Sequence, residues 1–280
     1  MMPSNREQLK AWIKKMSKNI AVNENIILQN YMLERLLERI SKSEYKYKFI
    51  LKGGMLISAI VGIDMRNTLD LDATIKGINL EKDNLIQILK EILNIDIQDG
   101  IEFNYINIKD IRQEDKYGGY RISIEGKFDK ITVPMKLDIS TGDIIVPKEI
   151  NYKFYLMFEE RAIEILAYNL ETVISDKIET IISRNIDNTR ARDFYDIYIL
   201  WTTQSCNFSR VVLKKAILEK FNYRETAHIL DNIDEILEAI EDSDTLKGYW
   251  NNYKNKFNYA SEIEYKEIMK VLREILNLLN

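Results

Sequence analysis

One stretch of the sequence decides the fold. Residues 47–75 read YKFILKGGMLISAIVGIDMRNTLDLDATI. A short apolar run precedes Gly53 and Gly54, helical spacing follows them as far as Val61, and apolar residues alternate with polar ones from Leu69 onward. This order predicts a strand, a glycine turn, a helix and a second strand. A glycine pair at such a turn lets the backbone approach a phosphate closely.

Three aspartates are the first candidates for chemistry. Asp70 and Asp72 are two residues apart on the expected strand and therefore share one of its faces. Two carboxylates this close repel each other unless a divalent cation or solvent lies between them, which favours Mg²⁺, although acidic residues also alternate along ordinary strands. Asp138 lies near the end of another apolar run, 131–139. It would complete the carboxylate set of two-metal phosphoryl chemistry.

The rest of the chain shows two sequence patterns, one of mixed helices and strands and one of helices. The segment 5–42 predicts two helices, and helical spacing returns over 81–93. The expected strands that follow cover 101–108, 120–125 and 131–139, with one more around 152–156. From residue 169 strand alternation stops and amphipathic helices succeed one another. The sequence therefore predicts an α+β lobe over 1–168 and a predominantly helical lobe over 169–280.

Composition excludes several function classes. The chain has 280 residues and a net charge of -4, with a single cysteine and a single histidine. An internal disulfide and a Cys/His zinc cluster are excluded, so chemistry must use Asp, Glu, Lys, Arg or hydroxyl groups. No run of about 20 apolar residues or secretory leader is present, so we expect a cytoplasmic protein with no membrane association. Bulk charge does not indicate nucleic-acid binding, but a local basic groove remains open.

A second group of charged residues falls in the helical half. Lys177 could follow charge as it moves between phosphates, or it could be an ordinary surface lysine. Asp193 and Asp196 are three residues apart on one helix face. We expect one of them to pair with Arg190 or Arg192 and the other to point into a cleft. An Arg–Asp network of this kind is also common as scaffolding.

A glycine pair between two expected strands is a weaker candidate. Gly118 and Gly119 are flanked by Lys116 and Arg121. The favoured interpretation is a hairpin turn bordered by solubilising charges, and the alternative is a second nucleic-acid contact.

Together these segments resemble the AbiEii/AbiGii nucleotidyltransferase toxins of type IV toxin–antitoxin and abortive-infection systems. The chain is most similar to the AbiEii members and is related to the MenT toxins. The family often has Ser in place of Gly54 and Thr68, and Lys in place of Arg192. The four motifs in family order are Lys52-Gly53-Gly54 with Arg66-Asn67-Thr68-Leu69-Asp70-Leu71-Asp72, then Lys136-Leu137-Asp138, the helix around Lys177, and Arg190-x-Arg192-Asp193-x-x-Asp196.

The resemblance implies a polymerase-β-like lobe with a mixed sheet, and it implies roles for individual residues. Arg66 would contact phosphate or RNA or else pair with a carboxylate, and phosphorylation of Thr68 would repel the triphosphate. The implied ligands of Mg²⁺ or Mn²⁺ are Asp70, Asp72 and Asp138. The implied phosphate-binding residues are Gly53, Gly54, Arg66, Thr68 and Lys177. The implied catalytic residues are Asp70, Asp72, Asp138, Lys177 and Asp193, with Asp196 and Arg190 as further candidates.

The same resemblance implies a function. The expected enzyme transfers a nucleoside monophosphate from an NTP, GTP by similarity to AbiEii, to an RNA acceptor such as the 3′ end of tRNA, and arrests growth. We expect a monomer whose cognate antitoxin forms no stable complex with it. The alternatives are a metal-dependent nuclease, a phosphotransferase, or a catalytically quiet protein that binds RNA or the antitoxin.

Overall fold

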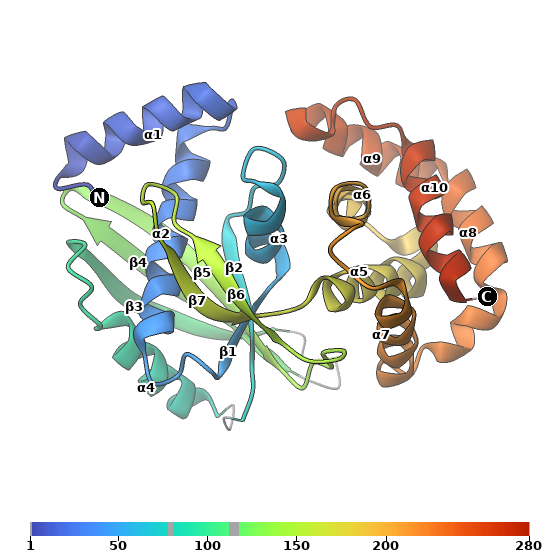
Figure 1. Ribbon diagram of the computed structural model, residues 1–280, viewed down its shortest axis with the longest axis horizontal. Coiled ribbons are helices and arrows are strands. Elements are labelled where there is room, and N and C mark those ends of the chain that lie inside the picture. The colour runs from blue at the N-terminus through green and yellow to red at the C-terminus, as the bar shows by residue number, and fades with distance from the viewer. Residues whose placement is uncertain (1, 78–80, 112–117, 280) are drawn as a thin grey trace. The chain divides into compact units, whose positions relative to one another are not determined.

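The computed structural model describes residues 2–77, 81–111 and 118–279. Its chain forms two compact units, and neither unit is a continuous segment (Figure 1). The predicted α+β class is confirmed. The first unit comprises Met1–Asp143 and Glu149–Ala167, and the second comprises Ile144–Lys148 and Tyr168–Asn280.

The first unit is a mixed sheet with helices packed on it. Its elements are α1 (Arg6–Ile20), α2 (Glu24–Lys42), β1 (Phe49–Lys52), α3 (Gly53–Val61), β2 (Asp70–Ile75), α4 (Lys82–Leu93), β3 (Ile101–Ile111), β4 (Gly119–Phe128), β5 (Ile131–Thr141), β6 (Ile150–Tyr155) and β7 (Ala162–Ala167). The predicted order of strand, glycine turn, helix and strand at 47–75 is confirmed.

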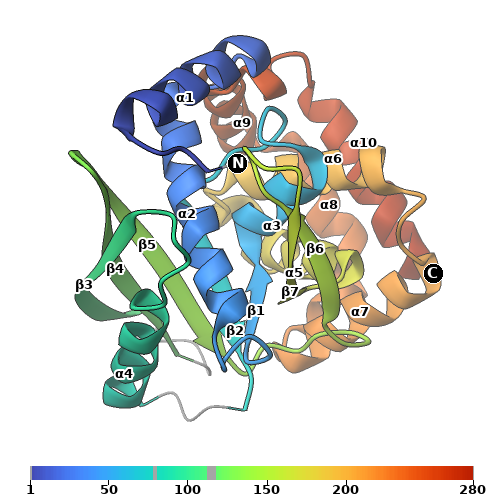
Figure 2. The same cartoon turned by 60° about the vertical axis from the view of Figure 1, so that its left-hand side comes forward.

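The sheet has the strand order β3-β4-β5-β2-β1-β7-β6. Strands β2 and β5 pair in parallel, as do β1 and β7, whereas the other neighbours are antiparallel. Leu71, Ala73 and Ile75 are buried on one face of β2, and Asp70 and Asp72 therefore lie on the other. Helix α2 packs on β5 and β7, and α4 lies beside β3 (Figure 2).

Helix α2 carries an unusual number of buried charges. Arg35 and Glu38 have fully buried side chains, and Arg35 contacts Glu34 at 2.7 Å and Glu159 at 2.9 Å. Arg161 closes the set by pairing with Glu38 at 2.8 Å. We call these five residues the α2 ion network. Every acid in it faces at least one guanidinium, which is what burial of charge requires.

The second unit is helical after residue 168, as its apolar spacing predicts. Asn169 caps its first helix by accepting a hydrogen bond from the Thr172 backbone N–H. Among the described residues no helix is long and apolar enough to cross a membrane. The helices are α5 (Leu170–Arg184), α6 (Ala191–Gln204), α7 (Arg210–Tyr223), α8 (Ile233–Asp242), α9 (Asp244–Lys256) and α10 (Tyr265–Leu276).

Two elements differ from the sequence expectation. Strand β7 lies in a segment for which no element was predicted, and its short alternation of buried Ile163 and Ile165 is completed by antiparallel pairing with β6 and parallel pairing with β1. The apolar spacing over 227–240 predicts one amphipathic helix, whereas the structure has a 3₁₀ helix, Ala227–Asn232, followed by α8. The pairing partners of β7 account for the first difference, since strand formation depends on neighbouring strands more than on intrinsic preference.

Candidate active site

The glycine turn brings β2 close to the start of α3. Gly53 has a positive φ of 65°, and a Cβ placed there would lie 2.2 Å from Oδ2 of Asp72. A Cβ at Gly54 would lie 2.7 Å from Oγ1 of Thr68. Real Cβ atoms do not approach other atoms this closely, so both positions are restricted to glycine in this arrangement. The pair therefore makes room for residues of the next strand, an effect that sequence reasoning did not anticipate.

The strand register brings the three predicted aspartates to one face of the sheet. Asp72 is the direct partner of Asp138 across the parallel β2–β5 ladder, and Asp70 lies two residues before Asp72. Burial raises the pKa of Asp70, and the nearby charges of Asp138 and Asp72 raise it further. We call Asp70, Asp72 and Asp138 the acidic trio. Its mutual repulsion is what a bound cation would relieve.

An arginine that sequence reasoning treated as a turn charge contacts this trio. Arg121 on β4 faces Asp138 on β5, donating from Nε to Oδ1 at 2.8 Å and from NH2 to Oδ2 at 2.6 Å. The hydrogen bonds to Asp138 raise the pKa of Arg121. Lys116, the other charge considered beside this turn, lies outside the described residues. The sequence does not reveal the β4–β5 register, and for this reason the contact between Arg121 and Asp138 was not predicted.

The donor chemistry of the trio fits a divalent cation at two of its members. Asp70 and Asp72 offer carboxylate oxygens, the ligands that Mg²⁺ and Mn²⁺ prefer, and within the described chain neither forms an ion pair. Both oxygens of Asp138 are occupied by Arg121. Within residues 2–77, 81–111 and 118–279, no three acidic, His or Cys side chains are grouped as a complete metal site.

A polar cluster that the sequence analysis missed continues along the same sheet face. Thr74 and Ser140 follow Asp72 and Asp138 by two residues, and their hydroxyls are 2.9 Å apart. Lys52 donates to the Ser140 hydroxyl at 2.6 Å and pairs with Asp143. Burial would raise the pKa of Asp143, but this ammonium and the hydroxyl donors hold it well below its ordinary value. Thr74 and Ser140 each follow an aspartate by two positions on the same strand, and this spacing could have identified them in the sequence.

Arg66 and Thr68 are buried beside the glycine turn. Arg66 is 2% exposed, and its guanidinium donates to the carbonyl of Asn67 and lies 3.3 Å from the position of a Cβ at Gly54. Thr68 is 5% exposed and precedes β2 instead of lying on it; its hydroxyl donates to the Asp70 carbonyl at 3.2 Å. In this arrangement both side chains support the turn.

The second unit gathers three of the predicted residues around one ammonium group. Lys177 on α5 pairs with Asp193 on α6 and contacts Asp196 at 3.0 Å. Asp193 and Asp196 are both buried, whereas Arg190 and Arg192 are exposed. The i, i+3 spacing turns both carboxylates toward the lysine of the preceding helix, a partner that the sequence analysis did not predict.

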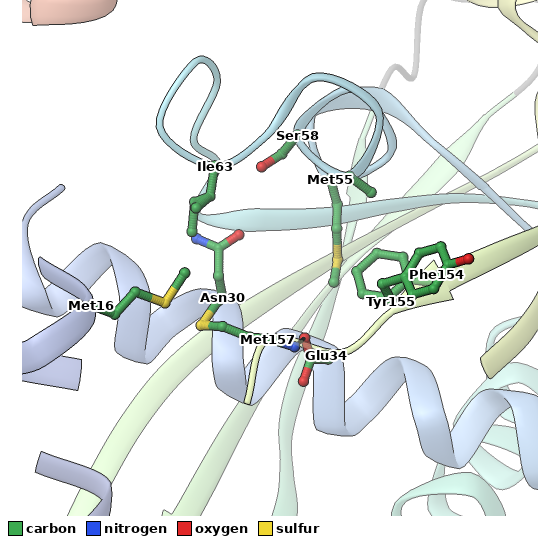
Figure 3. A pocket seen from close by; sticks show the side chains of 10 residues that line it. Met16, Asn30, Glu34, Met55, Ser58, Ile63, Phe154, Tyr155 and Met157 are labelled. Atoms are coloured by element: carbon green, nitrogen blue, oxygen red, sulfur yellow. Dashed lines mark hydrogen bonds between the residues drawn. The ribbon is translucent and has the colours of Figure 1, made fainter. Parts of the chain in front are cut away.

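A cavity in the first unit lies between α2, α3 and the end of β6 (Figure 3). Its volume is about 180 Å³, below the ~300–1,000 Å³ of typical ligand sites. None of the predicted site residues lines it, although Asn30 in its wall donates to the Thr68 carbonyl at 2.9 Å. The lining side chains are Met16, Asn30, Glu34, Met55, Ser58, Ala59, Ile63, Phe154, Tyr155 and Met157.

Comparisons with known proteins agree with this geometry. Two solved structures share the fold: a protein of H. pylori described as a candidate nucleotidyltransferase, and JHP933 from Helicobacter pylori. Each is 19% identical with a TM-score of 0.51 and is matched over 92% of this chain, which spans 97% of the first and 94% of the second. No curated protein matches the chain.

The family described as nucleotidyl transferase AbiEii toxin, type IV TA system, matches residues 35–273. This match includes the glycine turn, the acidic trio and the Lys177 cluster. The chain belongs to the AbiEii family of nucleotidyltransferase toxins of type IV toxin–antitoxin systems.

Proposed function

We propose that this protein is a metal-dependent nucleotidyltransferase that moves a nucleoside monophosphate from an NTP to the 3′ end of a tRNA and thereby arrests growth. The observation that carries the proposal is the acidic trio on one sheet face beside a glycine turn. Carboxylates on neighbouring strands, next to backbone that a triphosphate can approach, are what this reaction requires.

In this proposal Asp70 and Asp72 hold Mg²⁺ or Mn²⁺, and Asp138 completes the set. A bound divalent cation would lower the pKa of the attacking hydroxyl and stabilise the departing pyrophosphate. Gly53 and Gly54 supply backbone N–H groups at the start of α3 for the phosphates, since Gly54 has no hydroxyl to offer. Because Arg66 is buried, its contribution is to hold this turn.

Lys177 is the proposed phosphate ligand of the second unit. Asp193 and Asp196 fix the position of its ammonium group, and Asp193 is needed for activity for that reason. Arg190, which is exposed at the N-cap of α6, is the proposed contact to an RNA backbone in this unit. A phosphoryl group on Thr68 would require the buried turn to open first.

The remaining features of the proposal concern context. We propose GTP as the nucleotide, a cytoplasmic location where NTP and tRNA are abundant, and action as a monomer. We also propose that the cognate antitoxin forms no stable complex with the protein. The family match supports a toxin–antitoxin setting.

The test is incubation of the purified protein with each α-labelled NTP, Mg²⁺ or Mn²⁺, and total tRNA. The expected result is label on intact tRNA with release of pyrophosphate, lost in Asp72→Asn. The matched control is Asp110→Asn, which removes an exposed carboxylate from β3 of the same unit. Shortened RNA would indicate a nuclease, and tRNA binding without label would indicate a quiet binding protein; either result overturns the proposal.

A further inference from the structure

The guanidinium of Arg121 pairs with the carboxylate of Asp138, the third member of the acidic trio. Its planar guanidinium meets Asp138 through two parallel hydrogen bonds, at 2.8 and 2.6 Å, so both carboxylate oxygens are engaged. The two residues are direct partners across the antiparallel β4–β5 ladder. The contact therefore follows from the strand register and does not depend on a loop.

The charges around this contact do not balance. Asp70 and Asp72 also act on the Arg121 guanidinium at longer range, and one guanidinium cannot neutralise three carboxylates. A divalent cation would fit this excess better, because it provides two charges at one point. The guanidinium and a cation would compete for the Asp138 oxygens, because two positive groups held by one carboxylate repel each other.

The exposure of the two partners indicates which one moves. The Arg121 side chain is 42% exposed and the Asp138 side chain 13% exposed. Arginine can turn outward on its flexible stem while β4 stays paired, whereas Asp138 is confined between two strands. Exchange therefore needs only a side-chain rotation of Arg121.

We propose that Arg121 is a positioning residue, which holds the Asp138 carboxylate beside Asp72 until a divalent cation replaces the guanidinium. This inference rests on the proposed function, since it assumes that the trio binds the metal. Arg121 thereby sets the metal affinity of the site: it keeps Asp138 oriented at the cost of competing with the cation.

The first test measures Mn²⁺ affinity by calorimetry, without nucleotide, in wild type, Arg121→Gln, Arg121→Lys and Asp70→Asn. Arg121→Gln is expected to bind Mn²⁺ about fivefold to tenfold more tightly, with Arg121→Lys intermediate because it keeps the charge but loses the two-pronged contact. The matched control is Lys136→Gln, which removes an exposed charge next to Asp70 and measures the effect of charge alone.

Unchanged or weaker Mn²⁺ binding in Arg121→Gln, or an effect no larger than that of Lys136→Gln, overturns the role of Arg121. If neither wild type nor Arg121→Gln binds Mn²⁺ in a manner that depends on Asp70, the metal site of the proposed function fails instead. The two failures are therefore distinguishable.

The second test follows the wild-type protein by NMR and uses Arg121→Gln only to assign one signal. The Nε–H proton of Arg121 donates to Asp138 and gives its own NMR signal, which is assigned by its absence from Arg121→Gln. Titration of wild type with Mg²⁺ is expected to shift this signal toward that of a solvated arginine. The Nε–H of Arg161, which donates to Glu159 at 3.0 Å, is the internal reference. An unmoved Arg121 signal at saturating Mg²⁺ overturns the exchange.

Discussion

The acidic trio and the α2 ion network place carboxylates under opposite conditions. In the α2 ion network Glu34, Glu38 and Glu159 surround Arg35 and Arg161, and each acid has an arginine within 3.0 Å. In the trio three aspartates share one arginine, which contacts only Asp138. In the first set every acid side chain is largely buried and contacts an arginine, whereas in the second two of the three acids contact none.

This difference separates charge that stabilises the fold from charge that is kept for a ligand. Removing one partner from a set of buried, paired charges leaves an uncompensated charge and destabilises the protein. Removing one member of a repelling set relieves repulsion and leaves the fold intact. Substitutions in the two regions should therefore affect different measurements.

The largest expected effect is on catalysis. Asp70→Asn should lower the rate of label transfer by about 10³-fold, equivalent to about 4 kcal/mol, because it removes a metal ligand. Its free energy of unfolding in urea should be equal to or higher than that of wild type, since the burial and repulsion that raise the pKa of Asp70 no longer act on a charge. A variant that retains a tenth of the activity, or that unfolds more easily, would erase the contrast between the two regions.

The next effect is on stability. Arg35→Met should lower the free energy of unfolding by about 3 kcal/mol, because Glu34 and Glu38 lose a buried counter-ion. Arg6→Met is the control, since Arg6 pairs with Glu7 at an exposed position and should change stability by less than about 0.5 kcal/mol. Equal losses in the two variants, measured by urea unfolding, would contradict a structural role for the α2 ion network.

A pH dependence distinguishes one acid within the α2 ion network. Burial raises the pKa of Glu34 from 4.5 to about 7, although Arg35 and the Met157 backbone N–H oppose the shift. A raised carboxyl pKa means that the folded state retains its proton longer than the unfolded state does. The stability contributed by Glu34 is therefore present at low pH and is lost as pH rises from 4.5 toward 7.

Glu34→Gln cannot titrate, so its stability relative to wild type should rise by about 2 kcal/mol between about pH 5 and pH 8. Urea unfolding of both proteins across this range measures the difference, in which the titrations of all other groups cancel to first order. A difference that stays constant with pH would show that Glu34 is ionised throughout.

The smallest expected effect comes from a steric contact without charge, the close approach of Gly54 to Thr68, and it provides a third case to set beside the two charged regions. Gly54→Ala should destabilise the protein by about 1 kcal/mol, because the added Cβ would lie 2.7 Å from the Thr68 hydroxyl. The same substitution in a Thr68→Ala background should cost less, which a double-mutant cycle of unfolding free energies detects. If the two costs are equal, the glycine is not required by this approach.

Much of the fold could be predicted from local sequence patterns. The alternation around Asp70 and Asp72 and the glycine turn before α3 are short-range signals, and the structure follows them. Strand β7 was not predicted because its alternation covers only six residues. The structure completes it by pairing with β6 along its whole length and with β1, more than 100 residues away, at its end. Periodicity within a short window contains no information about such a partner.

The candidate site shows the same division. Its aspartates were identified from spacing, and they meet on one face because β2 and β5 pair in register. Two contacts of the predicted acids were not predictable: Arg121 reaches Asp138 through the β4–β5 ladder, and Lys177 meets both Asp193 and Asp196. Each contact depends on a strand register or on helix–helix packing between different segments of the chain, so no pattern within one short segment predicts it.

The discontinuous units have a consequence for protein engineering. The chain passes between them three times, and the inserted segment Ile144–Lys148 is held by the start of α5: Thr172 accepts from the Val146 backbone N–H at 3.0 Å, and Asn169 donates to the Lys148 carbonyl at 2.8 Å. A single cut after residue 167 would separate these partners, and a cut after residue 143 would remove β7 from β1. Separate expression of the first unit therefore requires a gene that joins residue 143 directly to residue 149 and ends at residue 167. Such a gene omits both segments of the second unit, which a single truncation cannot do.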